Sequence, residues 1–220
     1  MLSENGVSDL KEALQKARLV PVAAFSSVDA ALKVSEILLK FSLPLIEITL
    51  RTREAILCTE AVCRQFPEML VGSGSVLDRD SFKEALDVGS RFGVAPCLDL
   101  EILAFTQERG VPFMPGIATP SELNEALKAG CRFIKVFPAE SLGGPAYIRA
   151  LTAPFKLRDF FLVPTGGISE NNVRSYLEAD RVLACGATYI VESSLIDKGD
   201  FREIKKRIER FSFLMKETNP

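Results

Sequence analysis

Short apolar runs rich in Val, Ile and Phe alternate along this chain with longer segments of helical spacing. The runs are VPVAAF (20–25), LIEITL (45–50), MLVGSGS (69–75), RFGVAP (91–96), VPFMPG (111–116), FIKVFP (133–138), FFLVPTGG (160–167) and RVLACG (181–186). The helical segments are 28–40, 54–66, 81–86, 99–109, 122–128, 170–178 and 201–216, and the polar N-terminus leads into a further amphipathic helix. The unit recurs about every 20–25 residues, which indicates βα repeats with a parallel sheet.

Eight runs of strand type with helices between them predict an α/β protein, a (β/α)₈ TIM barrel with an extra N-terminal helix. A doubly wound open sheet is the rival architecture, but the Gly-rich first turn that it needs is missing after VPVAAF. No linker or charge block divides the chain, so we expect residues 1–220 to form a single domain. Reactive side chains of such a barrel lie near the carboxyl ends of its strands.

Composition narrows the range of functions. The net charge is −2 and no basic block or stripe is present, so neither nucleic acid nor a membrane is an expected partner. Histidine is absent, which excludes imidazole metal sites and Ser-His-Asp or Cys-His pairs. Five scattered cysteines and the lack of a signal peptide or long apolar run predict a cytoplasmic protein. We expect a small-molecule substrate and no metal or other cofactor.

The run FIKVFP places Lys135 among apolar neighbours. In a barrel interior this lysine would lose hydration, which favours the neutral amine, and a neutral amine can form a Schiff base with a ketone. The alternative is a strand-end lysine whose stem packs while its ammonium group reaches water. Phe137 lies on the same face and could wall the pocket, whereas Glu140 is expected to be a solvated loop residue.

The run LIEITLRT has two different faces. Strand alternation puts Glu47, Thr49 and Arg51 on one face and only aliphatic residues on the other, so the mixed face is expected to point into the barrel. There the carboxylate could move protons and the guanidinium could bind a substrate carboxylate. A buried Glu47–Arg51 ion pair that only holds the strands is an equal alternative.

Glycines mark the ends of two further strands. In MLVGSGS, Gly72 and Gly74 would let a ligand approach the backbone, and Ser73 and Ser75 would supply hydroxyl groups, although such a segment is also good loop material. The segment VPTGGISENN ends the seventh run and leads into a helix that Ser169 is expected to cap.

Glycine amides at a helix N-terminus can bind an anion, and barrels often hold phosphate after strands 7 and 8. Gly166 and Gly167 follow strand 7, and Thr188 follows strand 8, so a phosphate site is favoured over a simple turn with a capped helix. Elsewhere, Thr119 and Glu122 have the spacing of a capping box and are expected to shape the mouth of the barrel.

Taken together, the chain resembles the 2-keto-3-deoxy-6-phosphogluconate (KDPG) and 4-hydroxy-2-oxoglutarate (KHG) aldolases. The resemblance rests on EITLRT, VGSGSVL, PGIATPSE, FIKVFPAE, VPTGGIS and VLACGATYIV, in register from about residue 18 to 195. It implies that Lys135 is the Schiff-base lysine and that Glu47 moves protons, through a water. It also implies that Arg51 and Ser75 bind the pyruvyl carboxylate.

The resemblance further implies a place for the other end of the substrate. Thr165 would line the aldehyde side, Gly166, Gly167 and Thr188 would form the phosphate cradle, and Pro96 and Phe137 would be apolar walls. It also implies a homotrimer and a role in the Entner–Doudoroff route of carbohydrate metabolism.

Three positions depart from the family pattern. GSGS stands where the family has GAGT, Ala95-Pro96-Cys97 where it has SPG, and Ala187 where it has a second glycine. None of the changes removes a catalytic group, so they bear on substrate preference more than on activity.

The expected reaction is cleavage of KDPG to pyruvate and glyceraldehyde 3-phosphate. Cleavage of 4-hydroxy-2-oxoglutarate to pyruvate and glyoxylate becomes plausible if the phosphate site is weak. The alternatives are a sugar-phosphate isomerase or lyase that forms no covalent intermediate, and a catalytically silent barrel that binds sugar phosphates.

Overall fold

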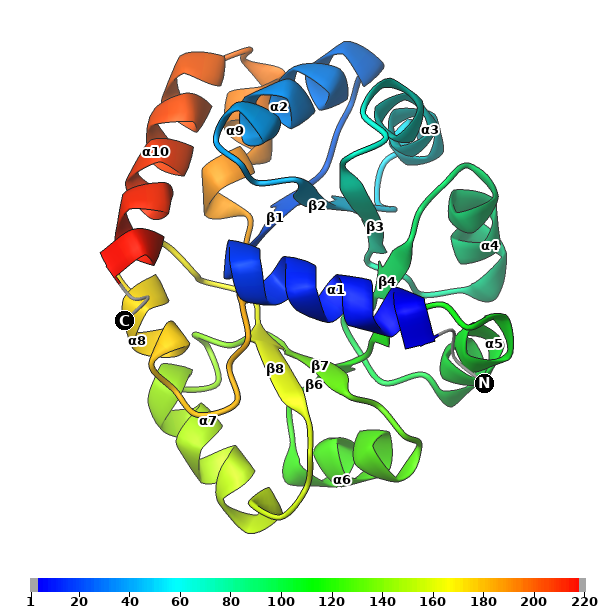
Figure 1. The fold of residues 1–220 in the computed structure, drawn as a ribbon, viewed down its shortest axis with the longest axis vertical. Helices are drawn as coiled ribbons and strands as arrows, with labels where there is room; N and C mark the ends of the chain where they lie inside the picture. The colour runs from blue at the N-terminus through cyan, green and yellow to red at the C-terminus, as the bar shows by residue number, and fades with distance from the viewer. Residues whose placement is uncertain (1–3, 218–220) are drawn as a thin grey trace.

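Parallel strands form the centre of the molecule and helices surround them (Figure 1). The computed structural model describes residues 4–217, with side chains for residues 6–214, so residues 1–3 of the predicted N-terminal segment lie outside the described residues. The strands are β1 (Leu19–Ala23), β2 (Leu45–Thr49), β3 (Leu70–Gly74), β4 (Phe92–Val94), β5 (Phe113–Met114), β6 (Gly116–Ile117), β7 (Phe133–Val136), β8 (Phe161–Pro164) and β9 (Cys185–Ala187). Each matches one of the apolar runs, and β5 and β6 share the fifth run.

The strands form two curled parallel sheets. One has the order β5-β4-β3-β2-β1-β9 and the other the order β6-β7-β8. Pro115 separates β5 from β6, and its carbonyl accepts a hydrogen bond of 2.9 Å from the amide of Lys135. Isolated parallel bridges pair Leu162 with Val182 and Thr165 with Gly186. The architecture is therefore α/β with a curled parallel sheet, and all carboxyl ends of the strands lie on one side.

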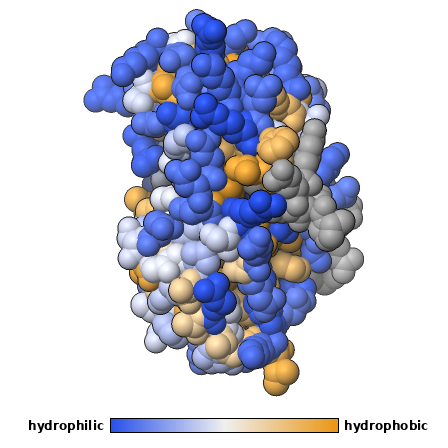
Figure 2. Space-filling model, turned by 90° about the vertical axis from the view of Figure 1, so that its left-hand side faces the viewer, coloured by the Kyte–Doolittle hydropathy of each residue, from blue (hydrophilic) through white to orange (hydrophobic). Residues whose placement is uncertain are grey.

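The helices cover the outside of the strands. They are α1 (Glu4–Ala17), α2 (Val28–Lys40), α3 (Ala55–Gln65), α4 (Arg79–Asp87), α5 (Leu100–Arg109), α6 (Pro120–Lys128), α7 (Gly144–Thr152), α8 (Val173–Leu177), α9 (Ser193–Asp197) and α10 (Phe201–Glu217), with 3₁₀ turns at Ala153–Phe155 and Tyr189–Val191. The face over α8 and α10 is mostly hydrophilic, with apolar residues near its middle (Figure 2). In the described part of the chain, no helix combines the length and the apolar character that crossing a membrane requires.

Local sequence signals explain where several helices begin. The side chains of Asp78, Asp99 and Thr119 accept hydrogen bonds from the first amides of α4, α5 and α6. Thr119 caps α6 as predicted, with its hydroxyl accepting the amide of Glu122, while the Glu122 carboxylate accepts the Thr119 hydroxyl and the amide of Ala118 at 2.8 Å. The hydrophobic pattern does not predict α7, because its first residues, Gly144 and a proline, are typical of a turn.

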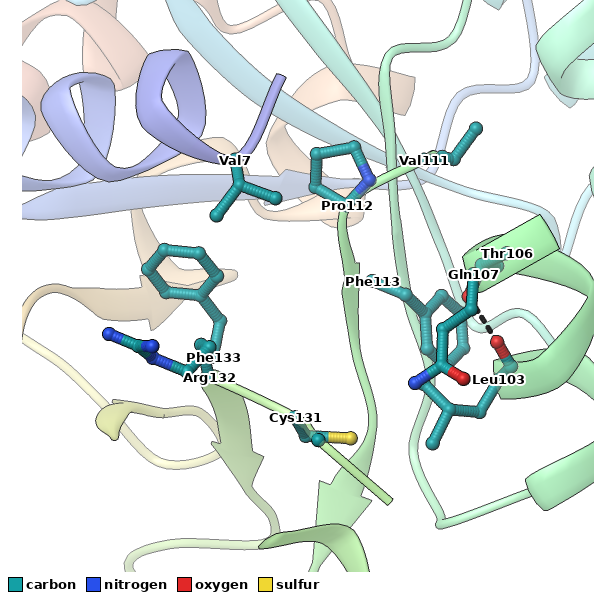
Figure 3. A pocket seen from close by; sticks show the side chains of 11 residues that line it. Val7, Leu103, Thr106, Gln107, Val111, Pro112, Phe113, Cys131, Arg132 and Phe133 are labelled. Carbon is teal, nitrogen blue, oxygen red and sulfur yellow. Dashed lines mark hydrogen bonds between the residues drawn. The ribbon is translucent and has the colours of Figure 1, made fainter. Parts of the chain in front are cut away.

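Helix α1 lies across the amino ends of the strands (Figure 1). Leu10 and Leu14 are buried beneath it, and burial of each leucine contributes about 1.5–3 kcal/mol. A cavity of about 30 Å³ remains under the helix, lined by Val7, Cys131 and Phe133 among others (Figure 3). Because Phe133 begins β7, this cavity lies at the end of the strands opposite to the predicted site.

Candidate active site

Lys135 lies in the buried interior of the strands. It is the third residue of β7, where it is paired in register with Gly116 of β6 and Val163 of β8. The residue is 6% exposed, and its Nζ lies 3.6 Å from Oε1 of Glu47 on β2. Strands β2 and β7 belong to different sheets, so this contact is made across the interior. The alternative of a lysine whose ammonium group reaches water is therefore wrong.

Glu47 faces the interior, as the two-faced pattern of its strand predicts. The residue is 2% exposed, and Oε1 has no hydrogen-bond partner. Its charged neighbour is Lys135, so the alternative of a Glu47–Arg51 ion pair is wrong. Removing two charges from water is costly, and a buried pair of this kind, with an unsatisfied oxygen, is poorly explained by stability alone. The arrangement instead offers an amine beside a group that can take up a proton.

Gly74 makes room for this carboxylate. A Cβ at Gly74 would lie 2.1 Å from Oε1 of Glu47, and a Cβ at Gly72 would lie 2.1 Å from Cζ of Phe92. The expectation that these glycines admit a ligand is therefore wrong, because protein side chains fill both spaces. Gly74 belongs to the site because it leaves space for the side chain of Glu47, which projects from the adjacent strand β2. The sequence does not show this proximity.

Ser73 is buried and points away from the reactive side chains. Its hydroxyl donates a hydrogen bond of 2.8 Å to the hydroxyl of Ser90, so it is part of the packing between strand and helix layer. Ser75 follows the strand with φ of 56°, in the left-handed region, and is partly exposed at the strand end. Strand alternation would place Ser73 and Ser75 on one face, but the strand ends at Gly74, between them.

Arg51 lies at the mouth of the site. Strand β2 ends at Thr49, and the exposed Arg51 turns back so that its Nε donates to Oγ1 of Thr49 at 3.4 Å. Its guanidinium is thus anchored to the strand end that carries Glu47. The inward direction that alternation predicts for Arg51 is therefore wrong, because the strand ends two residues before it and the residue is exposed in the turn.

Apolar groups border the lysine. The Nζ of Lys135 lies 5.3 Å from the ring centroid of Phe137, which is partly exposed. Pro96 is also partly exposed and packs by its backbone against Gly116, where a Cβ would lie only 2.3 Å from the carbonyl carbon of the proline. Phe137 therefore borders the amine directly. Pro96 contacts Gly116, the residue of β6 that is paired in register with Lys135.

Thr165 is buried where β8 meets β9. A Cβ at Gly186 would lie 2.3 Å from Oγ1 of Thr165, so this glycine, like Gly74, makes room for a polar side chain. Gly166 and Gly167 follow with φ of 98° and 79°, in the left-handed region that glycine adopts readily. Thr188 is exposed after β9, the strand that the Thr165–Gly186 bridge joins to β8.

The helix after this turn begins later than predicted. Helix α8 starts at Val173, and Ser169 belongs to a preceding turn in which its carbonyl accepts the amides of Asn172 and Val173. The side chain of Asn172 closes this turn, since its Oδ1 accepts the amide of Ser169 at 2.9 Å. Ser169 is therefore not a helix cap.

Sequence reasoning also missed the role of Glu140. Its Oε2 accepts hydrogen bonds from the hydroxyl of Tyr176 at 2.6 Å and from Nδ2 of Asn172 at 3.1 Å. The prediction of a solvated loop residue is confirmed, because Glu140 is exposed in a turn, but the sequence does not predict these two partners. These partners are far away in the sequence, so no local pattern indicates them.

Within the described side chains, no group of three or more Cys, Asp or Glu residues is placed to hold a metal ion. The five cysteines are free, and burial raises the pKa of Cys58 and of Cys131 to about 11.

Comparison with known proteins identifies the family. The family model for KDPG and KHG aldolase matches residues 10–207. The 2-dehydro-3-deoxy-phosphogluconate aldolase of Treponema pallidum (strain Nichols) is 36% identical over 193 residues, which cover 88% of this chain and 91% of the relative. The KHG/KDPG aldolase of Escherichia coli (strain K12) is 32% identical over 203 residues, which cover 92% of this chain and 94% of the relative.

A solved structure agrees with this assignment. The KDPG aldolase from Legionella pneumophila, with pyruvate captured at low pH as a covalent carbinolamine intermediate, has a TM-score of 0.85 to this chain at 30% identity. The match covers 90% of this chain and 95% of that chain. This chain belongs to the KDPG and KHG aldolase family.

Proposed function

We propose that this protein is a class I aldolase that cleaves KDPG to pyruvate and glyceraldehyde 3-phosphate through a Schiff base on Lys135. The observation that carries the proposal is the buried contact of 3.6 Å between Nζ of Lys135 and Oε1 of Glu47. Family membership and the carbinolamine captured in the Legionella relative support the same chemistry.

Glu47 serves as the proton carrier of the reaction. It takes a proton from the ammonium group of Lys135, and the neutral amine attacks the C2 carbonyl to give a carbinolamine. Glu47 returns this proton to the carbinolamine hydroxyl, and loss of water leaves a protonated imine, which accepts the electron pair of the breaking C3–C4 bond. Glu47 takes the C4 hydroxyl proton, directly or through a water, as the aldehyde forms. The enamine is then protonated at C3, and hydrolysis of the imine releases pyruvate.

Arg51 and Ser75 bind the pyruvyl carboxylate. The guanidinium is a planar donor suited to a carboxylate, and its hydrogen bond to Thr49 directs it to the mouth above Glu47. Ser75 contributes a hydroxyl group from the end of the neighbouring strand. Holding the carboxylate fixes the angle of the C3–C4 bond to the plane of the imine, which is an orientation effect.

The aldehyde half of the substrate extends toward β8 and β9. The phosphate is bound by Gly166, Gly167 and Thr188, since backbone amides in a glycine turn suit an anion. The side chains beside the aldehyde carbons are Thr165, Pro96 and Phe137. The E. coli relative is named for both substrates, so we also propose slower cleavage of 4-hydroxy-2-oxoglutarate to pyruvate and glyoxylate.

Borohydride trapping tests the mechanism. Incubation with pyruvate, reduction and peptide mass spectrometry should locate a reduced pyruvate adduct on Lys135. The Lys135→Arg variant is the matched control, because it keeps the positive charge beside Glu47 but cannot form the imine. An adduct on another residue, or KDPG cleavage without any adduct, would contradict the mechanism and favour a non-covalent lyase or isomerase. Binding of sugar phosphate without cleavage would instead indicate a silent barrel.

We further propose that residues 1–220 form a single closed (β/α)₈ barrel in which α1 is an extra N-terminal helix. The short break at Pro115, the two bridges between β8 and the β9 region, and the Lys135–Glu47 contact across the interior support closure. We also propose a homotrimer and a place in the Entner–Doudoroff route from the family resemblance, and a cytoplasmic location from the scattered cysteines. Light scattering of the purified protein tests the trimer.

A further inference from the structure

The turn at Gly166 and Gly167 is tied to the rest of the protein through its carbonyl oxygens. The carbonyl of Gly166 accepts the amide of Glu140 at 3.0 Å, and the carbonyl of Gly167 accepts Nδ2 of Asn172 at 2.8 Å. In a planar trans peptide the N–H points opposite to the C=O. The amides of Gly167 and Ile168 therefore point away from these partners. Among the hydrogen bonds of residues 4–217, none uses either amide.

Glu140 and Asn172 also hold each other. Besides Gly167, Asn172 contacts Oε2 of Glu140 through Nδ2 and the amide of Ser169 through Oδ1. The Glu140 side chain occupies the space beside Gly167, where a Cβ would lie 2.4 Å from Cβ of Glu140. Asn172 thus connects Gly167 with Ser169 across the turn. Glu140 connects the turn to the segment that follows Lys135.

Tyr176 anchors this group to the core. The residue is 0% exposed on α8, and its hydroxyl donates to Oε2 of Glu140 at 2.6 Å. Burial, and then the hydrogen bond to Glu140, raise the pKa of the phenol, so the hydroxyl keeps its proton and remains a donor at neutral pH.

We propose that Glu140, Asn172 and Tyr176 are positioning residues that orient the amides of Gly167 and Ile168 toward the distal phosphate of the substrate. The inference rests on the proposed function and deepens it: these residues set the preference for a phosphorylated aldehyde without touching the reacting atoms. They act on binding of the phosphate and not on the bond that breaks.

Single variants separate this role from general support of the fold. Tyr176→Phe removes only the hydroxyl, and it should raise KM for KDPG on the order of tenfold with little change in kcat. Asn172→Ala removes the ties to both Gly167 and Glu140, so its effect on KM should be larger. Glu140→Gln keeps an oxygen acceptor and should restore most of the affinity that Glu140→Ala loses.

Two readouts must stay unchanged. Pyruvate carries no phosphate, so the rate of borohydride trapping on Lys135 should equal that of the parent protein in all four variants. Tyr147→Phe is the matched control, because it also removes a tyrosine hydroxyl, which donates to the carbonyl of Ala118 at 2.5 Å, and leaves the turn alone. This control should retain the parent KM for KDPG.

The outcomes are distinct from those that test the proposed function. Equal losses in trapping and in KDPG cleavage, or an unchanged KM in Tyr176→Phe and Asn172→Ala, would overturn the positioning role. If the parent protein fails to trap pyruvate, the proposed function fails, and calorimetric titration with inorganic phosphate still decides the inference. Weaker phosphate binding in Tyr176→Phe than in Tyr147→Phe would support it, and equal binding would overturn it.

Discussion

Lys135 and Glu47 project from two strands, whereas Gly166 and Gly167 lie in a turn that hydrogen bonds from other segments hold in place. The first pair is buried, and its geometry follows from strand register and from the space at Gly74. The second pair is reached by solvent and depends on side chains of the β7 and β8 loops. In the proposed mechanism, the two ends of the substrate are thus bound by parts of the protein that are positioned in different ways.

This difference separates the residues that determine the chemical steps from those that determine which substrate is preferred. A change among the strands should affect every substrate, because each must form the imine and lose a proton near Glu47. A change in the turn should affect only substrates that carry the distal phosphate. In a barrel, loops can vary while the strand ends keep the reacting groups, which is how one fold serves several substrates.

The largest effect is expected for Glu47→Gln. The amide has the shape of the carboxylate but cannot take a proton, so kcat should fall roughly 10²–10⁴-fold with KDPG and with 4-hydroxy-2-oxoglutarate alike. A coupled assay of pyruvate release measures both. Glu36→Gln makes the same change at a partly exposed position on α2, in the outer helix layer, and should leave kcat unchanged. A loss confined to the phosphorylated substrate would contradict the assignment of Glu47 to the chemical steps.

A smaller effect is expected for Gly74→Ala. The new methyl group would overlap Oε1 of Glu47, and displacement of a reacting group by about 1 Å can lower the rate 10²-fold. Gly72→Ala, on the same strand as Gly74, is the matched control, since its methyl group would overlap Phe92 of β4 and not the carboxylate. Both variants should lose about 1–3 kcal/mol of stability from overpacking, as thermal unfolding would measure. Equal losses of kcat in the two would show that the position of Glu47 is not the cause.

The strand patterns predict much of the fold and the inward positions of Lys135 and Glu47. The alternation in LIEITL predicts the inward face of Glu47, and the apolar neighbours of Lys135 predict its burial, because both patterns are local and of period two. The apolar runs likewise locate each strand. These features need no knowledge of distant partners.

The remaining features depend on contacts between segments far apart. Gly74 is required by a side chain of β2, and Glu140 is held by Tyr176, which lies 36 residues further along the chain. The side chain of Asn172 closes the turn before α8 by accepting the amide of Ser169, and it also donates to Glu140, 32 residues earlier in the chain. A single sequence shows the residues of these contacts but not their proximity.

The smallest effect is expected from alkylation of Cys97, the exposed cysteine beside Pro96. Burial raises the pKa of Cys58 and Cys131 to about 11 and also raises that of Cys185, so at pH 8 only about 10⁻³ of each of the first two is thiolate. Iodoacetamide at pH 8 should therefore label Cys97 well before these three, as peptide mass spectrometry would show.

Labelling at Cys97 distinguishes the two ends of the site once more. Cys97 is hydrogen-bonded to the strands through its backbone, since its carbonyl accepts the amide of Gly116 at 3.2 Å. A modified side chain should therefore leave pyruvate trapping on Lys135 unchanged and alter KDPG cleavage by a few fold at most. Loss of pyruvate trapping after labelling at Cys97 alone would contradict this expectation. It would mean that a change at the mouth of the site shifts the strands that hold Lys135 and Glu47.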